Sequence, residues 1–349
     1  MKLRPLKRNP LTRLLSAGYG DAVGLRNLAY DRVPALSSEA ARPVICVGAL
    51  HAGGTGKTPM TARVAERLIR GGCTVVLLSR GYGRRGAEPV VITSEQRVDS
   101  WRRVGDEPYL LKQRLPRLWM GIGADRVSLA RRIGRCCPPA TVFVMDDGFQ
   151  HRRLRRNLDI VCLPPAPEYP EHLLPTGFLR EPPAALQRAG VVCVIGSPGE
   201  LAAMERRRRM VLKRVPRLQA ALLFQRPDCW VHLGTGRRAA RPPLHNPSAL
   251  CAIARPERFA AMISQQGVSC RSTRCLRDHD PFEDDGLLLR EARDGDGILT
   301  TEKDAARLEG RAIVNDLEIW YLKVVLEPAD EESEAVLSSA IDKVVGMVI

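Results

Sequence analysis

The residues with the clearest chemical meaning form a glycine-rich run at positions 51–58, with the sequence HAGGTGKT. Three glycines let the backbone turn tightly and point its N–H groups at phosphate oxygens. A lysine at the end of such a run reaches the β- and γ-phosphates of a nucleotide, and the hydroxyl after it is a ligand for Mg²⁺. The run therefore predicts ATP and Mg²⁺ as cofactors; a glycine turn with a chance lysine is the less favoured alternative. The predicted ATP-binding residues are His51, Ala52, Gly53, Gly54, Thr55, Gly56, Lys57 and Thr58.

One position departs from the strict phosphate-loop pattern. That pattern is G-x-x-x-x-G-K-[ST], and His51 stands where its first glycine would be. The surroundings match the pattern. Residues 44–50 are a short apolar run typical of a buried parallel strand, and residues 60–70 have helical spacing. A strand before the loop and a helix after it is the arrangement in which helix N–H groups meet phosphate.

Two adjacent carboxylates are candidates for the metal. Asp146 and Asp147 follow the apolar run at 141–145, and a P-loop enzyme needs an acid at the end of a second buried strand to hold Mg²⁺. Thr58 would be a further ligand. The sequence leaves open whether Asp146 or Asp147 binds the ion. The alternative is a strand-end pair that caps the next loop.

The wider pattern is an alternation of strands and helices. Apolar runs at 44–50, 74–78, 118–122, 141–145, 158–163 and 191–195 predict the strands of a doubly wound α/β domain. A basic and proline-rich break follows at 200–247. Strands are expected again at 249–254, 297–301 and 317–324, with helices at 256–266, 284–293 and 303–309. We expect a P-loop NTPase-like α/β/α sandwich at 36–220 and a smaller α/β/α domain at 221–349 that closes over the active site.

The first 35 residues are predicted to be a helical, membrane-associating segment. Lys2, Arg4, Lys7, Arg8 and Arg13 alternate there with leucines, and residues 1–20 contain no acid. Such an amphipathic helix places its cations among anionic head groups and its leucines at the acyl boundary. A helix that packs on the protein's own surface is an equally open alternative. The chain has no apolar stretch of about 18 residues, the length at which a membrane span is considered.

The net charge of +15 concerns partners rather than fold. Nucleic acid, an anionic membrane and a phosphorylated substrate are the candidates. Single-strand nucleic-acid binding predicts aromatic residues among the basic ones, and the basic run at 206–217 has none, so no nucleic acid is expected. The ten cysteines form no C-x-x-C pair of the zinc type, and the chain lacks the N-K-x-D motif of a GTPase.

Over about residues 11–324 the sequence resembles the tetraacyldisaccharide 4′-kinase family. Nine motifs carry the resemblance in the same order along the chain, which makes it specific although each is weak alone. His51 lies where the family normally has a hydroxyl residue. The motifs are residues 43–59 around the loop, 78–83 (LSRGYG), 104–108 (VGDEP), 123–126 (GADR), 146–151 (DDGFQH), 174–182 (LPTGFLREP), 253–259 (IARPERF), 278–279 (DH) and 300–304 (TTEKD).

The resemblance implies a reaction and a place for it. The γ-phosphoryl group of ATP would pass to the 4′-hydroxyl of a tetraacyldisaccharide 1-phosphate, which gives lipid IVA in lipid A biosynthesis. The enzyme would work as a peripheral or monotopic protein at the cytosolic face of a Gram-negative inner membrane, with that anionic surface as a partner. A monomer is expected. The implied fold is two α/β/α units joined by a short β linker, with ATP between them; a related protein that binds lipid without turnover is the alternative.

The resemblance also implies residue roles. Lys57, Asp106 and His279 are the predicted catalytic residues, with Asp106 as the base and His279 as its partner from the second domain, so that domain closure assembles the pair. Without the resemblance, Asp106 could equally be a helix cap and His279 a structural histidine.

Further residues are expected around this pair. Glu107 is predicted to hold Mg²⁺ together with the acids named above. Arg126 and Arg180 are predicted to contact the substrate or its phosphate, because guanidinium groups match phosphate oxygens; a surface salt bridge is the alternative for each. Tyr82 is predicted to line the active site on the substrate side. Lys303 is expected to support the closed arrangement of the domains.

Overall fold

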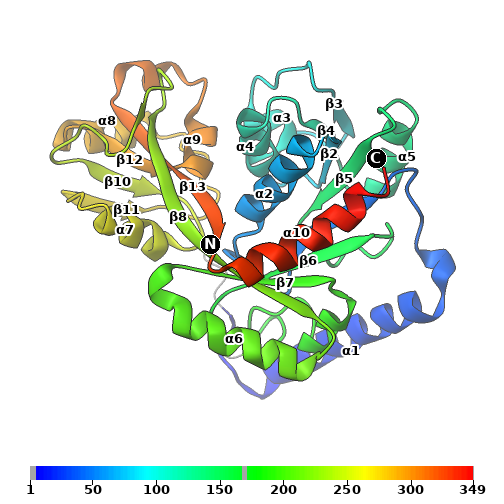
Figure 1. Ribbon diagram of the computed structural model, residues 1–349. Coiled ribbons are helices and arrows are strands. Elements are labelled where there is room, and N and C mark those ends of the chain that lie inside the picture. The colour runs from blue at the N-terminus through cyan, green and yellow to red at the C-terminus, as the bar shows by residue number, and fades with distance from the viewer. Residues whose placement is uncertain (1–4, 167–170, 349) are drawn as a thin grey trace.

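A computed structural model describes residues 5–166 and 171–348. Lys2 and Arg4 of the predicted membrane segment lie outside the described residues. The architecture is one continuous sheet of 13 strands, in the order β11-β10-β12-β13-β8-β7-β6-β1-β5-β2-β4-β3, with β9 beside β8. Helices lie against this sheet (Figure 1). The predicted α/β class is therefore confirmed.

The larger part of the sheet is parallel except at its edge. Its strands read as apolar runs because helices bury them, and several have every residue buried. The strands are β1 (Val44–Ala49), β2 (Thr74–Ser79), β4 (Trp119–Ile122), β5 (Thr141–Asp146), β6 (Leu158–Leu163) and β7 (Val191–Gly196), with β3 (Val90–Ile92) antiparallel at the edge. The helices are α2 (Lys57–Arg70), α3 (Trp101–Val104), α4 (Asp106–Arg114), α5 (Arg126–Gly134), α6 (Leu201–Arg214) and α10 (Glu331–Val345).

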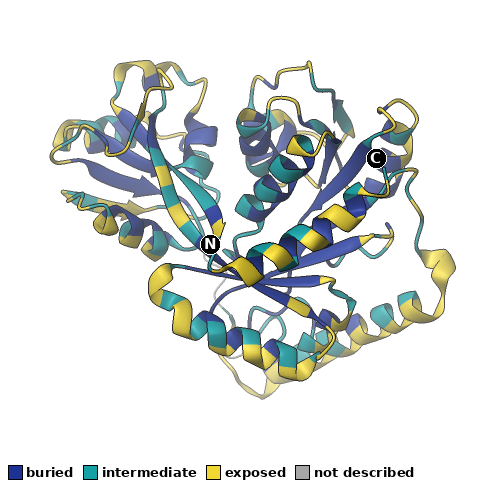
Figure 2. Cartoon of the chain, viewed as in Figure 1, coloured by how far each residue is buried: buried dark blue, intermediate teal, exposed yellow. Residues whose placement is uncertain are grey.

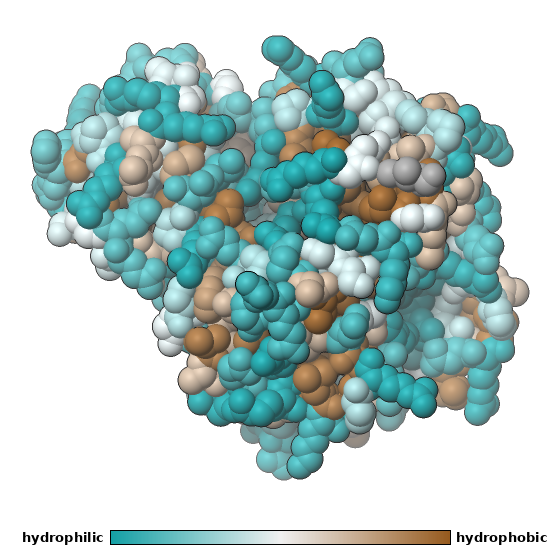
Figure 3. All heavy atoms as spheres, viewed as in Figure 1, coloured by the Kyte–Doolittle hydropathy of each residue, from teal (hydrophilic) through white to brown (hydrophobic). Residues whose placement is uncertain are grey.

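A smaller part continues the sheet and has apolar cores of its own. Figure 3 shows the two parts as separate lobes with a notch between them at the upper edge. The strands of the smaller part are β10 (Ser248–Cys251), β11 (Ser272–Cys275), β12 (Ile298–Thr301) and β13 (Ile319–Pro328), and its helices are α7 (Pro256–Gln265), α8 (Asp285–Asp294) and α9 (Glu302–Leu308).

Two long strands join the parts. β8 (Gln219–His232) begins parallel to β7, where Gln219 pairs with Val191, and then runs antiparallel to β13, where His232 pairs with Trp320. β13 returns the chain to the larger part, where α10 packs against β6, β7 and α2 (Figure 1). The predicted boundaries at 35 and 220 stay a prediction; α10, which that prediction assigned to the smaller domain, lies on the larger part.

The region expected to be a break contains regular structure. α6 and β8 occupy residues 201–232, and β8 continues to the short β9 (Arg238–Ala239). The basic run is an amphipathic helix, because α6 buries Met204, Arg207 and Val211 on one face while Arg206, Arg209 and Arg214 are exposed. The buried Arg207 forms an ion pair with Glu171, a residue distant in sequence.

The N-terminal helix α1 (Pro10–Arg32) begins at Asn9, whose side chain caps the N–H of Thr12. Figure 2 shows it along the lower edge of the molecule, largely exposed. Polar contacts hold one side of it: the Tyr19 hydroxyl donates to the carbonyl of Arg180 (2.8 Å), and the Asn27 amide donates to Glu181 (2.7 Å). The exposed side carries leucines, namely Leu11, Leu14, Leu15 and Leu25. Among residues 5–166 and 171–348, no helix has the length and apolar character that a membrane crossing needs.

Candidate active site

The glycine-rich loop lies between the end of β1 and the start of α2, as predicted. Gly53, Gly54 and Gly56 have φ angles of 81°, 35° and 80°, which side chains rarely adopt. A Cβ on Gly54 would lie 2.8 Å from Cγ of Arg255, so the side chain of a residue from the smaller part covers the loop. The backbone N–H groups at the start of α2 and the lysine after the glycines are groups that could together hold phosphate.

His51 begins the loop in a buried position, paired across an isolated bridge with Leu179. Neither ring nitrogen has a hydrogen-bond partner among the described residues. Oε1 of Glu171 lies 3.8 Å from Nε2. Burial, followed by the charge of Arg207, lowers the pKa of His51 from 6.5 to about 4. The residue that replaces glycine here is therefore a neutral imidazole at neutral pH.

The two carboxylates after β5 are in different electrostatic states. Asp146 is buried and accepts a hydrogen bond from Thr61 Oγ1 (2.9 Å); burial and the charges of Glu107 and Asp147 raise its pKa to about 7. Burial would also raise the pKa of Asp147, but Lys57 and Arg180 outweigh it and lower that pKa. Arg180 Nη1 contacts both oxygens of Asp147 at 2.8 and 3.0 Å, and Lys57 Nζ lies 3.7 Å away.

The residues at this site fit Mg²⁺ bound together with a nucleotide. Within the described ranges no group of three or more His, Cys, Asp or Glu side chains could hold a metal alone. Mg²⁺ usually takes one or two carboxylates and completes its shell with water and phosphate oxygens. The charges of Glu107 and of the loop residue Lys57 both act on the pKa of Asp146. Carboxylates from the end of β5 and the start of α4 are therefore close enough to the loop to interact with it electrostatically. The buried Thr55 hydroxyl in the loop has no partner in the described part of the chain, which leaves it for a ligand.

Asp106 and His279 meet across the two parts of the molecule. His279 Nδ1 lies 2.8 Å from Asp106 Oδ2, although the two residues are 173 positions apart. Lys303 of α9 lies 3.2 Å from the other ring nitrogen of His279 and 3.0 Å from Glu107. An ammonium only donates, so Nε2 accepts and the proton is assigned to Nδ1, which donates to Asp106.

The charge of Asp106 is held by its neighbours. Burial would raise its pKa, but the hydrogen bond from His279 and the charges of Lys303 and Arg307 outweigh burial and hold the pKa well below its usual range. Burial would also raise the pKa of Glu107, but the charge of Lys303 more than offsets this effect, so the pKa of Glu107 is lowered. Both acids are therefore ionised at neutral pH, which is the state that the predicted roles of base and metal ligand require.

The other predicted residues lie around these groups. Tyr82 is exposed, and its ring meets that of His279 edge-on at a centroid distance of 4.9 Å. Arg126 is buried; its Nη1 donates to the carbonyl of Ala124 at 3.2 Å, and its Nε has no partner in the part of the chain that the structure describes. The structure thus joins Asp106, Glu107, His279 and Lys303 in one network and Lys57, Asp147 and Arg180 in another. Among the described residues, Arg126 has no hydrogen bond to either network.

Sequence reasoning missed two arginines. Arg307 forms an ion pair with Asp106, and Arg255 covers Gly54. Arg255 lies within the motif at 253–259, and Arg307 lies three residues after the motif at 300–304. Their places in or beside these motifs were the sequence signal by which they could have been found.

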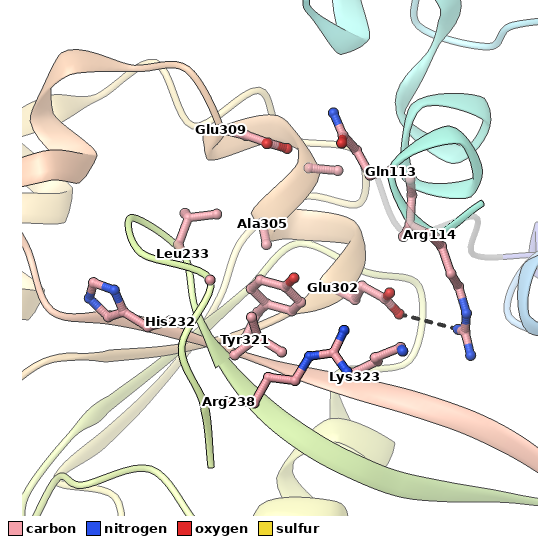
Figure 4. Close-up of a pocket in the computed structure, with 14 residues that line it drawn as sticks. Gln113, Arg114, His232, Leu233, Arg238, Glu302, Ala305, Glu309, Tyr321 and Lys323 are labelled. Carbon is pink, nitrogen blue, oxygen red and sulfur yellow. Dashed lines mark ion pairs between the residues drawn. The ribbon is translucent and has the colours of Figure 1, made fainter. Parts of the chain in front are cut away.

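A separate cavity of about 390 Å³ lies between α4 and the strands β8 and β13 (Figure 4). Arg114 projects into it from one side and pairs with Glu302 at 3.7 Å. Tyr321 and Lys323 line the opposite side. None of the predicted catalytic, nucleotide or metal residues lines this cavity, so the phosphate loop remains the better candidate for the chemistry.

The fold and this loop define a P-loop ATP-dependent phosphotransferase. The family described as Tetraacyldisaccharide-1-P 4'-kinase matches residues 8–342, and the chain belongs to it. The chain is 35% identical to Tetraacyldisaccharide 4'-kinase of Geobacter metallireducens over 96% of its length and 97% of that protein. It is 31% identical to the protein of the same name from Chlorobium limicola, over 97% of this chain and 99% of that protein. The crystal structure of LpxK from Aquifex aeolicus in complex with ATP is similar, with a TM-score of 0.74, 25% identity, and coverage of 95% of this chain and 97% of that one.

Proposed function

We propose that the protein transfers the γ-phosphoryl group of ATP to the 4′-hydroxyl of a tetraacyldisaccharide 1-phosphate, which gives lipid IVA in lipid A biosynthesis. The observation that carries the proposal is the 2.8 Å contact between His279 and Asp106. This contact joins the candidate base to a residue of the smaller part, and the base lies in the larger part, which also carries the phosphate loop. The name that the relatives from Geobacter and Chlorobium share, Tetraacyldisaccharide 4'-kinase, supports the acceptor.

The loop residues bind the nucleotide. Backbone N–H groups at Gly53, Gly54 and Gly56 hold phosphate oxygens, and Lys57 stabilises the charge on the transferred group. Mg²⁺, when bound, neutralises charge on the β- and γ-phosphates. Thr58, Glu107 and the pair Asp146 and Asp147 would hold it; Asp147 already carries two cationic neighbours, which leaves Asp146 the freer ligand.

Asp106 acts as the base. Its carboxylate takes the proton of the acceptor hydroxyl, the hydroxyl oxygen attacks the γ-phosphorus, and the bond from that phosphorus to the bridging oxygen of ADP breaks. His279 orients the carboxylate through its Nδ1 proton, and Lys303 orients His279. We assign Tyr82, Arg126 and Arg180 to the substrate side, where the guanidinium groups would contact phosphate.

The lipid substrate implies a membrane partner. We propose that the protein is a peripheral or monotopic monomer on the cytosolic face of a Gram-negative inner membrane. The exposed leucines of α1 support contact with a bilayer, because four of them have half or more of their surface in water: Leu11 65%, Leu14 70%, Leu15 51% and Leu25 69%.

The test is phosphate transfer from γ-labelled ATP to tetraacyldisaccharide 1-phosphate in detergent micelles, with and without Mg²⁺. Lys57→Ala should lose transfer, while Lys213→Ala, an exposed lysine on α6, should keep it. Labelled lipid that needs both Mg²⁺ and Lys57 supports the proposal. ATP binding with no labelled lipid would mean that the chain binds nucleotide but acts on another acceptor or on none.

A further inference from the structure

Arg307 of α9 is buried to an unusual degree for an arginine. Its side chain is 1% exposed, and its Nε and Nη2 donate to Oδ2 of Asp106 at 2.9 and 2.5 Å. A buried guanidinium must have its charge paired, and the acid that pairs with it comes from the other part of the molecule. The contact therefore exists only when the two parts are together.

The smaller part holds Arg307 rigidly from behind. Nη1 donates to Asp304 Oδ1 (2.8 Å) and to the carbonyl of Ala252 (3.1 Å). Asp304 Oδ2 in turn accepts from the backbone N–H of Ala252 (3.0 Å) and the hydroxyl of Thr301 (2.7 Å). The backbone N–H of His279 donates to the same Ala252 carbonyl (3.1 Å). Arg307 and His279 are thus fixed relative to each other through one peptide group.

The two oxygens of Asp106 are used unequally. Oδ2 receives His279 Nδ1 and both Arg307 nitrogens. Among residues 5–166 and 171–348, Oδ1 receives one hydrogen bond, from the backbone N–H of Glu107 at 2.9 Å. A carboxylate oxygen has two lone pairs, so Oδ2 is saturated while Oδ1 has acceptor capacity left.

We propose that Arg307 is a positioning residue that occupies Oδ2 of Asp106 and so leaves Oδ1 to take the proton of the acceptor hydroxyl. This inference rests on the proposed function. When the proton moves to Oδ1, the hydroxyl oxygen forms its bond to the γ-phosphorus and ADP leaves with the electrons of the broken bond. Because the guanidinium belongs to the smaller part, Asp106 has this orientation only when the parts are closed.

The experiment is a double-mutant cycle between Arg307→Gln and Asp106→Asn in the transfer assay. A residue that acts through Asp106 loses its effect when Asp106 is already disabled. Arg307→Gln should lower kcat by about 10- to 100-fold in the wild-type background, the range expected for hydrogen bonds to a charged group. The KM for ATP should change less than about threefold, since Arg307 contacts no loop residue among the described contacts. In the Asp106→Asn background the same change should alter kcat by less than about twofold.

Arg114 is the matched control. It also crosses between the parts, with 8% of its side chain exposed, and contacts Glu66 at 3.0 Å and the carbonyl of Val324 at 3.1 Å. Arg114→Gln should have the same effect on kcat in both backgrounds. If the glutamine variant does not fold, Arg307→Lys is used in a second double-mutant cycle with Asp106→Asn. Lysine keeps the positive charge but lacks the paired guanidinium nitrogens that donate to Asp106.

An equal loss from Arg307→Gln or Arg307→Lys in both backgrounds would overturn the role of Arg307, because that is the signature of a structural arginine. Absence of transfer by the wild-type protein would instead overturn the proposed function. The two failures are therefore distinguishable.

Discussion

His51 predicts how the stability of the protein depends on pH. Its pKa is about 4 in the folded protein, against an ordinary value of 6.5 for histidine, so between these values the unfolded chain binds a proton that the folded one does not. The free energy of unfolding must therefore fall as the pH falls below about 6.5, and the loss from this residue ends near the folded pKa. At about pH 5, the titration of His51 makes the free energy of unfolding about 2 kcal/mol lower than it is well above the ordinary pKa.

The perturbation is His51→Gln, which keeps a polar side chain of similar length and removes the titration. Neither ring nitrogen of His51 has a described hydrogen bond that the change would break. Urea unfolding at about pH 7.5 and about pH 5, followed by tryptophan fluorescence, gives the two free energies for each protein. The variant should lose about 2 kcal/mol less than the wild type over this interval.

His151 serves as an internal reference for this comparison. Burial, followed by the charges of nearby arginines, also lowers its pKa to about 4, and it titrates in both proteins. The difference between the two proteins therefore isolates His51. A parallel loss of stability in wild type and variant would refute the reasoning, since it would mean that His51 gains no proton on unfolding.

Three further predictions follow from other parts of the site. Gly54→Ala should weaken ATP binding at least about tenfold in a fluorescent-nucleotide titration, because φ is +35° and the new Cβ would lie 2.8 Å from Arg255; an unchanged affinity would show that the loop relaxes freely. Lys303→Met should lower kcat at least about tenfold in steady-state assays, since its ammonium lies 3.0 Å from Glu107; retained turnover would remove Lys303 from the site. Leu14→Glu should reduce co-sedimentation with anionic vesicles about tenfold, because the side chain is 70% exposed on α1, whereas Leu14→Ile should not.

The phosphate loop could be read from the sequence because its parts are neighbours in the chain. β1, the glycines and α2 lie within residues 44–70, so local patterns of apolar and glycine residues were sufficient. The strands at 141–146 and 158–163 were predictable for the same reason, as short apolar runs that helices bury.

The contacts that connect the two parts could not be found from such patterns. Asp106 and His279 are 173 positions apart, and only the resemblance to a family suggested that they meet. Arg307 is 201 positions from Asp106 and reads in sequence as a charge on a short helix. Its burial depends on Asp304 and Ala252, which no local rule places around it.

α6 and β8 were missed for a related reason. The run of arginines at 206–209 reads as a solvated segment, but Arg207 is buried through its pair with Glu171. β8 lies beside a proline- and arginine-rich stretch, and its pairing with β13 becomes visible only when a strand some 90 residues later is placed next to it.

The path of β8 and β13 has a consequence for how the chain is made. The other strands and helices of the smaller part lie between these two strands in sequence, while α10, which follows β13, packs against the larger part through Leu337, Ile341 and Val344. Because translation runs from the N-terminus, the smaller part is complete before the larger one can bury that face. A nascent chain released before α10 has emerged would expose the apolar surface that these three residues cover, so α10 decides whether the earlier strands are protected from aggregation.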